Sequence, residues 1–340
     1  MAETTFQFAP ISPVNGYHDD NYWLWCPSIT QGPDGTWHLF VSRWPKTLPF
    51  HPGWLVASEV IRATSDRPEG PYEFAEVVLA KRGAQYWDGR STHNPSIRCH
   101  DGKYYLYYMG STHPLEEADH TLTTQSAQCI VARSMKRIGV AWADRPEGPW
   151  TRMDQPILTT QPNSFYSFLT SNPAPHIHSN GEVTLLFKAR EYEGNTHGSM
   201  SIGIAKADSP LGTYQVVKDT PIFSTDLFGE IEDPFLWMES DGFHMIAKDM
   251  SGELSGQAGA GIHAQSPDAQ SWTLSNPTTA YKRTIEYNDG TSRDVGSLER
   301  PFLHIENGQS KFLAAAVSNG TINFTDATKS WIHVIPLMNT

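Results

Sequence analysis

The chain has 340 residues, of which 39% are hydrophobic and 18% charged, a composition typical of a folded protein rather than a disordered one. Its formal net charge is −12 and it contains no basic run, which argues against nucleic acid and anionic membrane surfaces as partners. No apolar stretch is long enough to span a membrane, and the first residues lack a signal-peptide pattern, so we expect a cytoplasmic protein, or an exported one whose leader was removed.

Five copies of one pattern divide the chain. Each copy has a residue followed by Pro, then an apolar stretch and, seven or eight residues after the first, an Asp-Gly or Asn-Gly pair. The residues that precede Pro are Cys26, Asn94, Asn172, Asp233 and Arg300, at intervals of 61 to 78 residues. Asp-Gly and Asn-Gly favour the type I′ turn of a tight hairpin, so each copy predicts two antiparallel strands.

Two further strands complete each repeat. A β-rich run follows each turn, as in TWHLFVSRW and KYYLYYMGS, and then a motif such as AWADRPEGPW, whose last aromatic residue begins a fourth strand. Such repeats predict an all-β fold, a single five-bladed β-propeller over residues 1–340 with four antiparallel strands per blade. A β-sandwich is the alternative. We expect the leading FQFAPI segment to join the C-terminal strand near 331–337 and close the ring.

This topology predicts which residues share one face. The hairpin turns lie on one face, and the residues that precede Pro, the ends of the second strands and the long loops 43–58, 111–136 and 155–171 lie on the other. Because the residue before Pro differs in nearly every blade, the pattern favours an asymmetric ligand site over a purely structural repeat. The predicted substrate-binding residues are Arg43, Arg90, His93, Asn94, Asn172, Lys188, Arg190, Glu232, Lys248, Glu299 and Arg300.

Structural roles compete with these assignments. Asn94 and Asn172 equally suit turn capping, and the acidic and basic residues near 232 and 300 suit a lattice of salt bridges that closes the channel. Trp44 and Trp54 suit either a platform for sugar rings or simple loop packing. The six cations on this face exceed the need of a neutral sugar, so they indicate an acidic substrate or neutralise the nearby carboxylates.

The repeats resemble those of the five-bladed propeller glycosidases, meaning family 43 and its relatives such as families 32, 68, 117 and 130. The resemblance covers essentially the whole chain. It implies catalysis by carboxyl groups in the central pocket, but the family 43 base would fall at Cys26, which is no acid. The Glu232-Asp233-Pro234 sequence is similar to the EDP motif of the family 130 phosphorylases.

Hydrolysis of a glycosidic bond requires one protonated and one ionised carboxyl group. We assign Asp20 as the base, Asp233 as the acid and Asp88 as an orienting group, because Asp20 and Asp88 each lie six residues before a residue that precedes Pro. Three cysteines without paired spacing predict neither disulfides nor a zinc site. No cofactor or catalytic metal is expected, although a structural calcium or other ion in the central channel is compatible with the inward polar groups.

The sequence therefore predicts a glycoside hydrolase that cleaves a terminal bond of a plant- or algal-type oligosaccharide. A lyase acting on a uronide would use a histidine base such as His93, His113 or His197. A glycoside phosphorylase would use the cations to bind phosphate, and a non-catalytic sugar-binding propeller is the fourth interpretation. The sequence does not set the sugar, the linkage or the oligomeric state.

Overall fold

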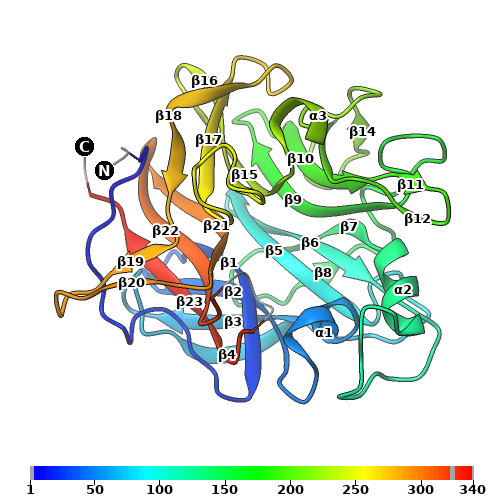
Figure 1. Ribbon diagram of the computed structural model, residues 1–340, viewed down its shortest axis with the longest axis horizontal. Coiled ribbons are helices and arrows are strands. Elements are labelled where there is room, and N and C mark those ends of the chain that lie inside the picture. The colour runs from blue at the N-terminus through cyan, green and yellow to red at the C-terminus, as the bar shows by residue number, and fades with distance from the viewer. Residues whose placement is uncertain (1–3, 322–325, 339–340) are drawn as a thin grey trace.

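The computed structural model describes residues 4–321 and 326–338, and five antiparallel sheets surround one axis (Figure 1). Blade one contains β1 (Tyr22–Gln31), β2 (Trp37–Pro45), β3 (Glu59–Ser65) and β4 (Glu73–Leu79). Blade two contains β5 (Ser91–His100), β6 (Lys103–Ser111), β7 (Arg137–Ala143) and β8 (Thr151–Arg152). Blade three contains β9 (Leu169–Ile177), β10 (Val183–Arg190), β13 (Ser201–Ala207) and β14 (Gln215–Val216).

Blade four contains β15 (Ile231–Glu239), β16 (Gly242–Asp249), β17 (Gly261–Ser266) and β18 (Thr273–Tyr281). Blade five contains β21 (Ser297–Glu306), β22 (Gln309–Ser318) and β23 (Ser330–Pro336). Two small hairpins project from the blades, β11 (Tyr192–Glu193) with β12 (Thr196–His197), and β19 (Thr284–Glu286) with β20 (Ser292–Asp294). Three short helices interrupt the loops, α1 (Phe50–Ala57), α2 (Ala127–Ser134) and α3 (Thr225–Phe228). The predicted five-bladed propeller is confirmed, with four strands in each of the first four blades and three in the described sheet of blade five.

The first strands of the blades form the inner ring. β1 contacts β5, β5 contacts β9, β9 contacts β15, β15 contacts β21, and β21 contacts β1 again. The fifth blade is completed by the N-terminal segment, in which Phe8 bridges Leu337 antiparallel and the Ala9 amide donates to the Pro336 carbonyl at 2.9 Å. Figure 1 shows these terminal segments side by side. The expected closure is therefore confirmed, and it pairs a strand edge that would otherwise stay open.

The residue before each of the five prolines distorts its inner strand. Cys26, Asn94, Asn172, Asp233 and Arg300 all have positive φ angles, between 48° and 60°. At each of them the pairing of the first and second strands shifts register. A non-glycine residue in this region costs about 1–3 kcal/mol. The strain repeats five times around the axis, and it breaks the regular alternation of side chains, so neighbouring residues there both reach the axial region.

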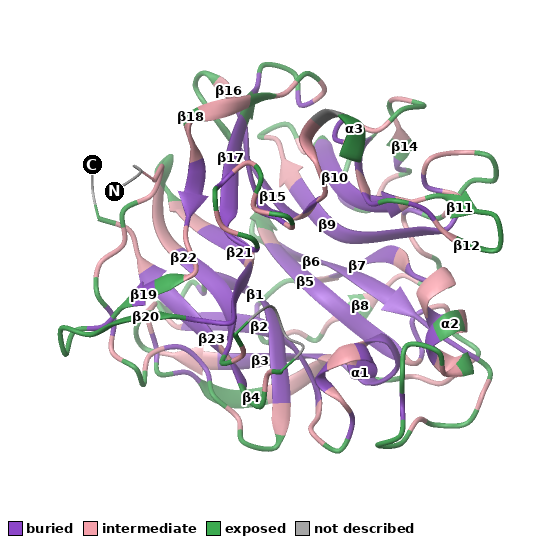
Figure 2. Cartoon of the chain, in the orientation of Figure 1, coloured by how far each residue is buried: buried purple, intermediate pink, exposed green. Residues whose placement is uncertain are grey.

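The core lies between the blades, where the first three strands of each blade are largely buried, whereas outer strands such as β4 are partly exposed (Figure 2). The recurring aromatic residue, which precedes the fourth strand in blades one to four and lies in the third strand β23 of blade five, contributes to this packing. Trp150 of blade two meets Phe40 of blade one with ring centroids 5.5 Å apart, and the Tyr214 hydroxyl of blade three lies 2.8 Å from that of Tyr107 in blade two. These aromatic residues therefore hold adjacent blades together. No helix among the described residues is long and apolar enough to cross a membrane.

Candidate active site

Two cavities follow the propeller axis. The narrower one, about 360 Å³, is lined by all five residues that precede Pro and by their prolines. The wider one, about 850 Å³, is lined by the starts of inner strands, the ends of second strands and residues of the segments around α1 and α2. Arg300 lines both cavities, so they meet at this residue.

Larger hollows also exist at the rim of the propeller. One, about 1800 Å³, lies beside blades three and four and is lined in part by the exposed turn residues Asp208, Ser209 and Asp268. Another, about 1340 Å³, lies under the N-terminal segment beside Phe6 and Phe8. Buried charged groups gather at the axis instead, and we therefore place the candidate site there.

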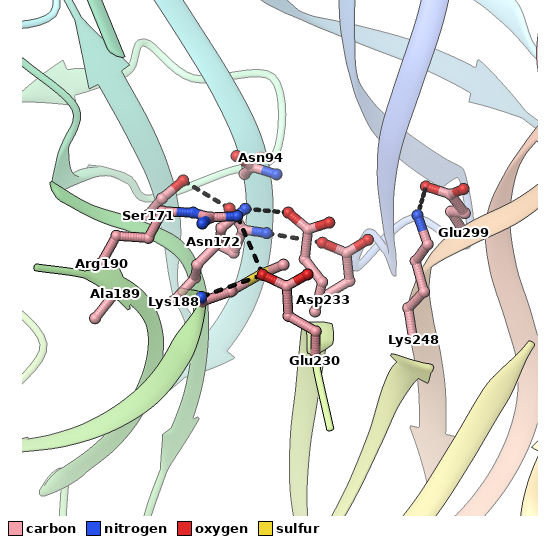
Figure 3. A network of polar contacts seen from close by, with 12 residues as sticks. Asn94, Ser171, Asn172, Lys188, Ala189, Arg190, Glu230, Asp233, Lys248 and Glu299 are labelled. Carbon is pink, nitrogen blue, oxygen red and sulfur yellow. Dashed lines mark hydrogen bonds and ion pairs between the residues drawn. The ribbon is translucent and has the colours of Figure 1, made fainter. Parts of the chain in front are cut away.

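Most of the predicted site residues meet at the axis. Those that line the wider cavity are His93, Lys188, Arg190, Glu232, Glu299 and Arg300. Those that line the narrower cavity are Asn94, Asn172, Asp233 and again Arg300. Lys248 lies behind Glu299, with its ammonium 2.8 Å from the carboxylate, and both side chains are almost fully buried (Figure 3).

Four predicted residues lie elsewhere, and two of them are carboxylic acids. Asp20 is exposed in the segment before β1 and is not among the described residues that line either cavity. Asp88 is fully buried inside blade two, where it accepts the Tyr108 hydroxyl at 2.8 Å and pairs with Arg82 at 2.6 Å. The assignments of Asp20 as base and Asp88 as orienting group are therefore corrected, because the loops that precede the inner strands do not overhang the pocket.

The other two are arginines, one near the end of β2 in blade one and one just before β5 in blade two, and both have other partners. Arg43 pairs with Glu59 at 2.9 Å and lies over the Tyr22 ring at 4.1 Å. Arg90 pairs with Glu117 and donates to the Leu115 carbonyl at 2.9 Å, which holds the following loop. Neither arginine lines the axial cavities, so both serve packing rather than the substrate-binding role predicted for them.

Glu232 and Asp233 are neighbours at the bulge of β15, and both contact Arg300. Burial raises the pKa of Glu232, but Lys188, Arg300 and Lys248 together outweigh burial and hold that pKa well below its usual value. Burial raises the pKa of Asp233 to about 7 against the opposing charge of Arg300, and the nearby carboxylates of Glu232 and Glu299 add to the rise. The two adjacent carboxyl groups therefore differ in protonation near neutral pH.

Hydrogen bonds fix the Asp233 carboxyl group. The Asn172 amide donates to one of its oxygens at 2.7 Å, and the Ser171 hydroxyl in turn donates to Asn172 at 2.6 Å (Figure 3). The second oxygen of Asp233 has no hydrogen-bond partner among the described residues. One oxygen is thus held and the other is available at the axis.

Cys26 occupies the position at which the resemblance to family 43 implies a catalytic base. Its sulfur lies 3.4 Å from His93 Nε2, and the Asn94 amide lies 3.3 Å away. Burial raises the pKa of this thiol to about 12, so it stays protonated. Burial also holds the pKa of His93 well below its usual value, and this imidazole is neutral. The Cys26 and His93 pair is therefore uncharged.

Aromatic side chains form one wall of the wider cavity. Trp25, Trp44, Phe50 and Trp54 line it. Trp44 is fully buried against Phe50, with ring centroids 5.3 Å apart, and Trp54 stacks on His93 at 4.9 Å. Packing therefore accounts for Trp44, whereas Trp54 remains at the cavity wall.

Two further cations line the wider cavity and were not predicted from the sequence, Arg133 at the end of α2 and Lys136 just after it. Both belong to the long 111–136 loop that was expected on this face, so the signal was present in the loop length. The group that comes closest to a metal-ligand set among the described residues is Glu239, Asp241 and His244. It lies at the hairpin turn of blade four, and none of its members lines the axial cavities.

No protein-family model and no curated protein matches the chain. Solved structures do match it. One is Zg3597, a family 117 glycoside hydrolase from the marine bacterium Zobellia galactanivorans, with 16% identity and a TM-score of 0.67 over 98% of this chain and 89% of that chain. Another is the α-L-arabinanase of Cellvibrio cellulosa complexed with arabinohexaose, with 14% identity and a TM-score of 0.58 over 95% of this chain and 93% of that chain.

A third match is CoXyl43, a family 43 β-xylosidase/α-arabinofuranosidase from a compost microbial metagenome, in complex with xylotriose. It shares 15% identity and a TM-score of 0.60, and the alignment covers 99% of this chain and 96% of that chain. Identities this low establish the fold and not the activity. The chain therefore has the five-bladed propeller fold of the family 117 and family 43 glycoside hydrolases, as the repeats indicated.

Proposed function

We propose that the protein is a glycoside hydrolase that binds an oligosaccharide in the wider axial cavity and cleaves it where the two cavities meet at Arg300. The observation that carries the proposal is the pair of adjacent carboxyl groups with opposite pKa shifts, Asp233 raised to about 7 and Glu232 well below its usual value. Environments that separate two carboxyl pKa values in this way mark an acid and its ionised partner.

Each carboxyl group has a role in this chemistry. Asp233 retains its proton near neutral pH and gives it to the oxygen of the departing sugar. Glu232, kept ionised by Lys188 and Arg300, replaces Asp20 as the anionic partner of the reaction. Arg300 touches both carboxylates, so it couples their charges. As the glycosidic bond breaks, the anomeric carbon gains the hydroxyl group of a water molecule, and the remaining proton of that water restores Asp233.

The walls of the cavity support a sugar as the substrate. Indole and phenyl rings from Trp25, Phe50 and Trp54 offer apolar faces of the kind on which sugar rings stack. Two structural neighbours of the same fold were solved with xylotriose and with arabinohexaose, which supports an oligosaccharide as the ligand of this chain.

The test is incubation with a panel of plant and algal oligosaccharides, with and without inorganic phosphate. We expect reducing sugar to appear without phosphate. Asp233→Asn and Glu232→Gln should each lower turnover about 10²–10⁴-fold, which is the usual contribution of an acid or base group. Asp101→Asn, in the exposed hairpin turn of blade two, is the matched control and should keep full activity.

Several results would contradict the proposal. Strict dependence on phosphate would indicate a phosphorylase, and products that absorb as unsaturated uronides would indicate a lyase. Binding of an oligosaccharide without turnover would indicate a non-catalytic propeller. Full activity in both Asp233→Asn and Glu232→Gln would exclude the carboxyl pair as the catalytic groups.

A further inference from the structure

We propose that Arg133 and Lys136 form an oxyanion subsite in the wider cavity, and that it binds the carboxylate of an acidic sugar such as a uronic acid. The inference rests on the proposed function, since it names the class of sugar that the cavity accepts. Neither residue was among the cations that the sequence suggested for this role.

The balance of charge in the cavity points to these two residues. Every cation predicted from the sequence contacts at least one acidic side chain; the contacts are Arg43 with Glu59, Arg90 with Glu117, Lys188 with Glu232, Arg190 with Glu230, Lys248 with Glu299, and Arg300 with both Glu232 and Asp233. Among the described residues, Arg133 and Lys136 line the same cavity and form no salt bridge. These two are therefore the cations of this cavity that contact no acidic side chain among the described residues.

Of the two residues, Lys136 gives the stronger evidence for an anion-binding site. Its side chain is 3% exposed, yet the only partner of its ammonium group in the described part of the chain is the Trp54 ring, at 4.9 Å from the ring centroid. A buried ammonium group that lacks an anionic partner costs several kcal/mol unless it loses its proton. An anionic ligand in the cavity would remove that cost.

Arg133 is held in place by a neutral histidine. His197 Nε2 lies 3.3 Å from Arg133 Nη1, and Nδ1 lies 3.2 Å from both Arg190 Nη1 and the Gly198 carbonyl. A guanidinium only donates, so Nε2 is the acceptor in the contact with Arg133. This contact uses one donor of Arg133, and a guanidinium has five, so the others remain for a ligand. A planar guanidinium also matches a carboxylate in geometry.

The surroundings of the two residues repel further positive charge. The pKa of Arg133 is lowered by burial and by Arg190. The pKa of Lys136 lies well below its usual value because of burial, Lys188, Arg133 and Arg300, with Glu232 opposing the shift. The neutral imidazoles that face Lys136 are those of His51 and His93. An anion bound here raises the pKa of Lys136, so binding should take up a proton.

The experiment measures binding and not turnover. Isothermal titration calorimetry on the full chain compares glucuronate with glucose, galacturonate with galactose, and each with inorganic phosphate and sulfate. We expect each uronate to bind at least about tenfold more tightly than its neutral counterpart. Lys136→Met and Arg133→Met should each remove about tenfold of the uronate affinity. Titration in two buffers of different ionisation enthalpy should show proton uptake at a pH above the pKa of free Lys136, and Lys136→Met should abolish it.

Lys46→Met is the matched control. Lys46 also lies over an indole ring, that of Trp23 at 5.4 Å, but it does not line the axial cavities. Its replacement should leave uronate affinity unchanged. Because Met is unbranched, is one atom shorter than Lys and has no ammonium group that needs a partner, we expect Lys136→Met to fold, and Arg133→Met gives an independent test if it does not.

Several outcomes would overturn the inference. These are equal affinity for uronates and neutral sugars, unchanged affinity in both variants, or tight binding of inorganic phosphate without binding of uronates. The two proposals fail separately. Hydrolysis of neutral oligosaccharides without uronate binding would remove the subsite and leave the hydrolase, whereas uronate binding without any turnover would do the reverse.

Discussion

Asp233→Asn should make the protein more stable while it removes activity. In the unfolded chain this carboxyl group ionises at its usual pKa of 3.8, and in the folded protein the pKa is about 7. Between these two values the folded state binds a proton that the unfolded state lacks, so the free energy of unfolding falls as the pH rises through this range. Above about pH 7 Asp233 is ionised in both states, and the whole decrease in the free energy of unfolding has occurred.

The magnitude follows from the two pKa values. A tenfold change in an ionisation constant corresponds to about 1.4 kcal/mol, so ionised Asp233 lowers the free energy of unfolding by up to about 4 kcal/mol. Asn is nearly isosteric and does not ionise, and it therefore avoids this cost. It can keep the 2.7 Å contact with Asn172 if its carbonyl oxygen accepts the hydrogen bond. The gain should be near zero at low pH and largest at alkaline pH.

The assay is urea unfolding followed by tryptophan fluorescence at a series of pH values from about 4 to 8. From about pH 4 to pH 8, the urea concentration at the unfolding midpoint should fall more for the wild-type protein than for Asp233→Asn. The variant should be the more stable protein at the alkaline end. If the variant is instead the less stable protein at about pH 8, Asp233 is ionised and its pair with Arg300 stabilises the fold. That result would refute its role as the acid.

Four further outcomes follow from the same contacts. Glu299→Gln leaves the buried Lys248 ammonium without its anion at 2.8 Å, so the free energy of unfolding in urea should fall by about 3–5 kcal/mol, and a paired Lys248→Met/Glu299→Met variant should recover most of it. Asp88→Asn should cost a similar amount, since Asp88 is fully buried with two arginines, but it should leave turnover per folded molecule unchanged; lost turnover at full stability would restore a catalytic role. Hydrolysis should decline as the pH rises above about 7, where Asp233 loses its proton, and a flat profile would contradict this. Treatment with a chelator should leave activity unchanged, and recovery of lost activity by an added metal would show that the expected absence of a catalytic metal is wrong.

The architecture was accessible from the sequence because a propeller is a repeat. Each Asp-Gly or Asn-Gly turn is a local signal, and five of them at similar intervals leave few alternatives to a ring of antiparallel sheets. The pairing of the N-terminal segment with the C-terminal strand also followed, because an open ring would expose a strand edge. Even the cluster at the axis could be predicted from the residues before the five prolines.

The identity of the working groups depended on the tertiary structure. Asp20 and Asp88 have the same sequence spacing to their prolines, yet one is exposed and the other is buried within its blade. Loop paths are not set by the period of the repeat, so spacing alone could not separate them. The positive φ angles, and hence the shared contact of Glu232 and Asp233 with Arg300, were equally invisible in the sequence.

Charge compensation is the clearest case of what only the tertiary structure decided. The sequence shows which residues are charged, and it indicated an excess of cations on the pocket face. Whether a given cation has a partner depends on distances between blades far apart in the chain, as for Lys188 with Glu232. The distances between side chains show that each predicted cation contacts an acidic residue. Arg133 and Lys136 also line the cavity, but no acidic side chain among the described residues lies within salt-bridge distance of either.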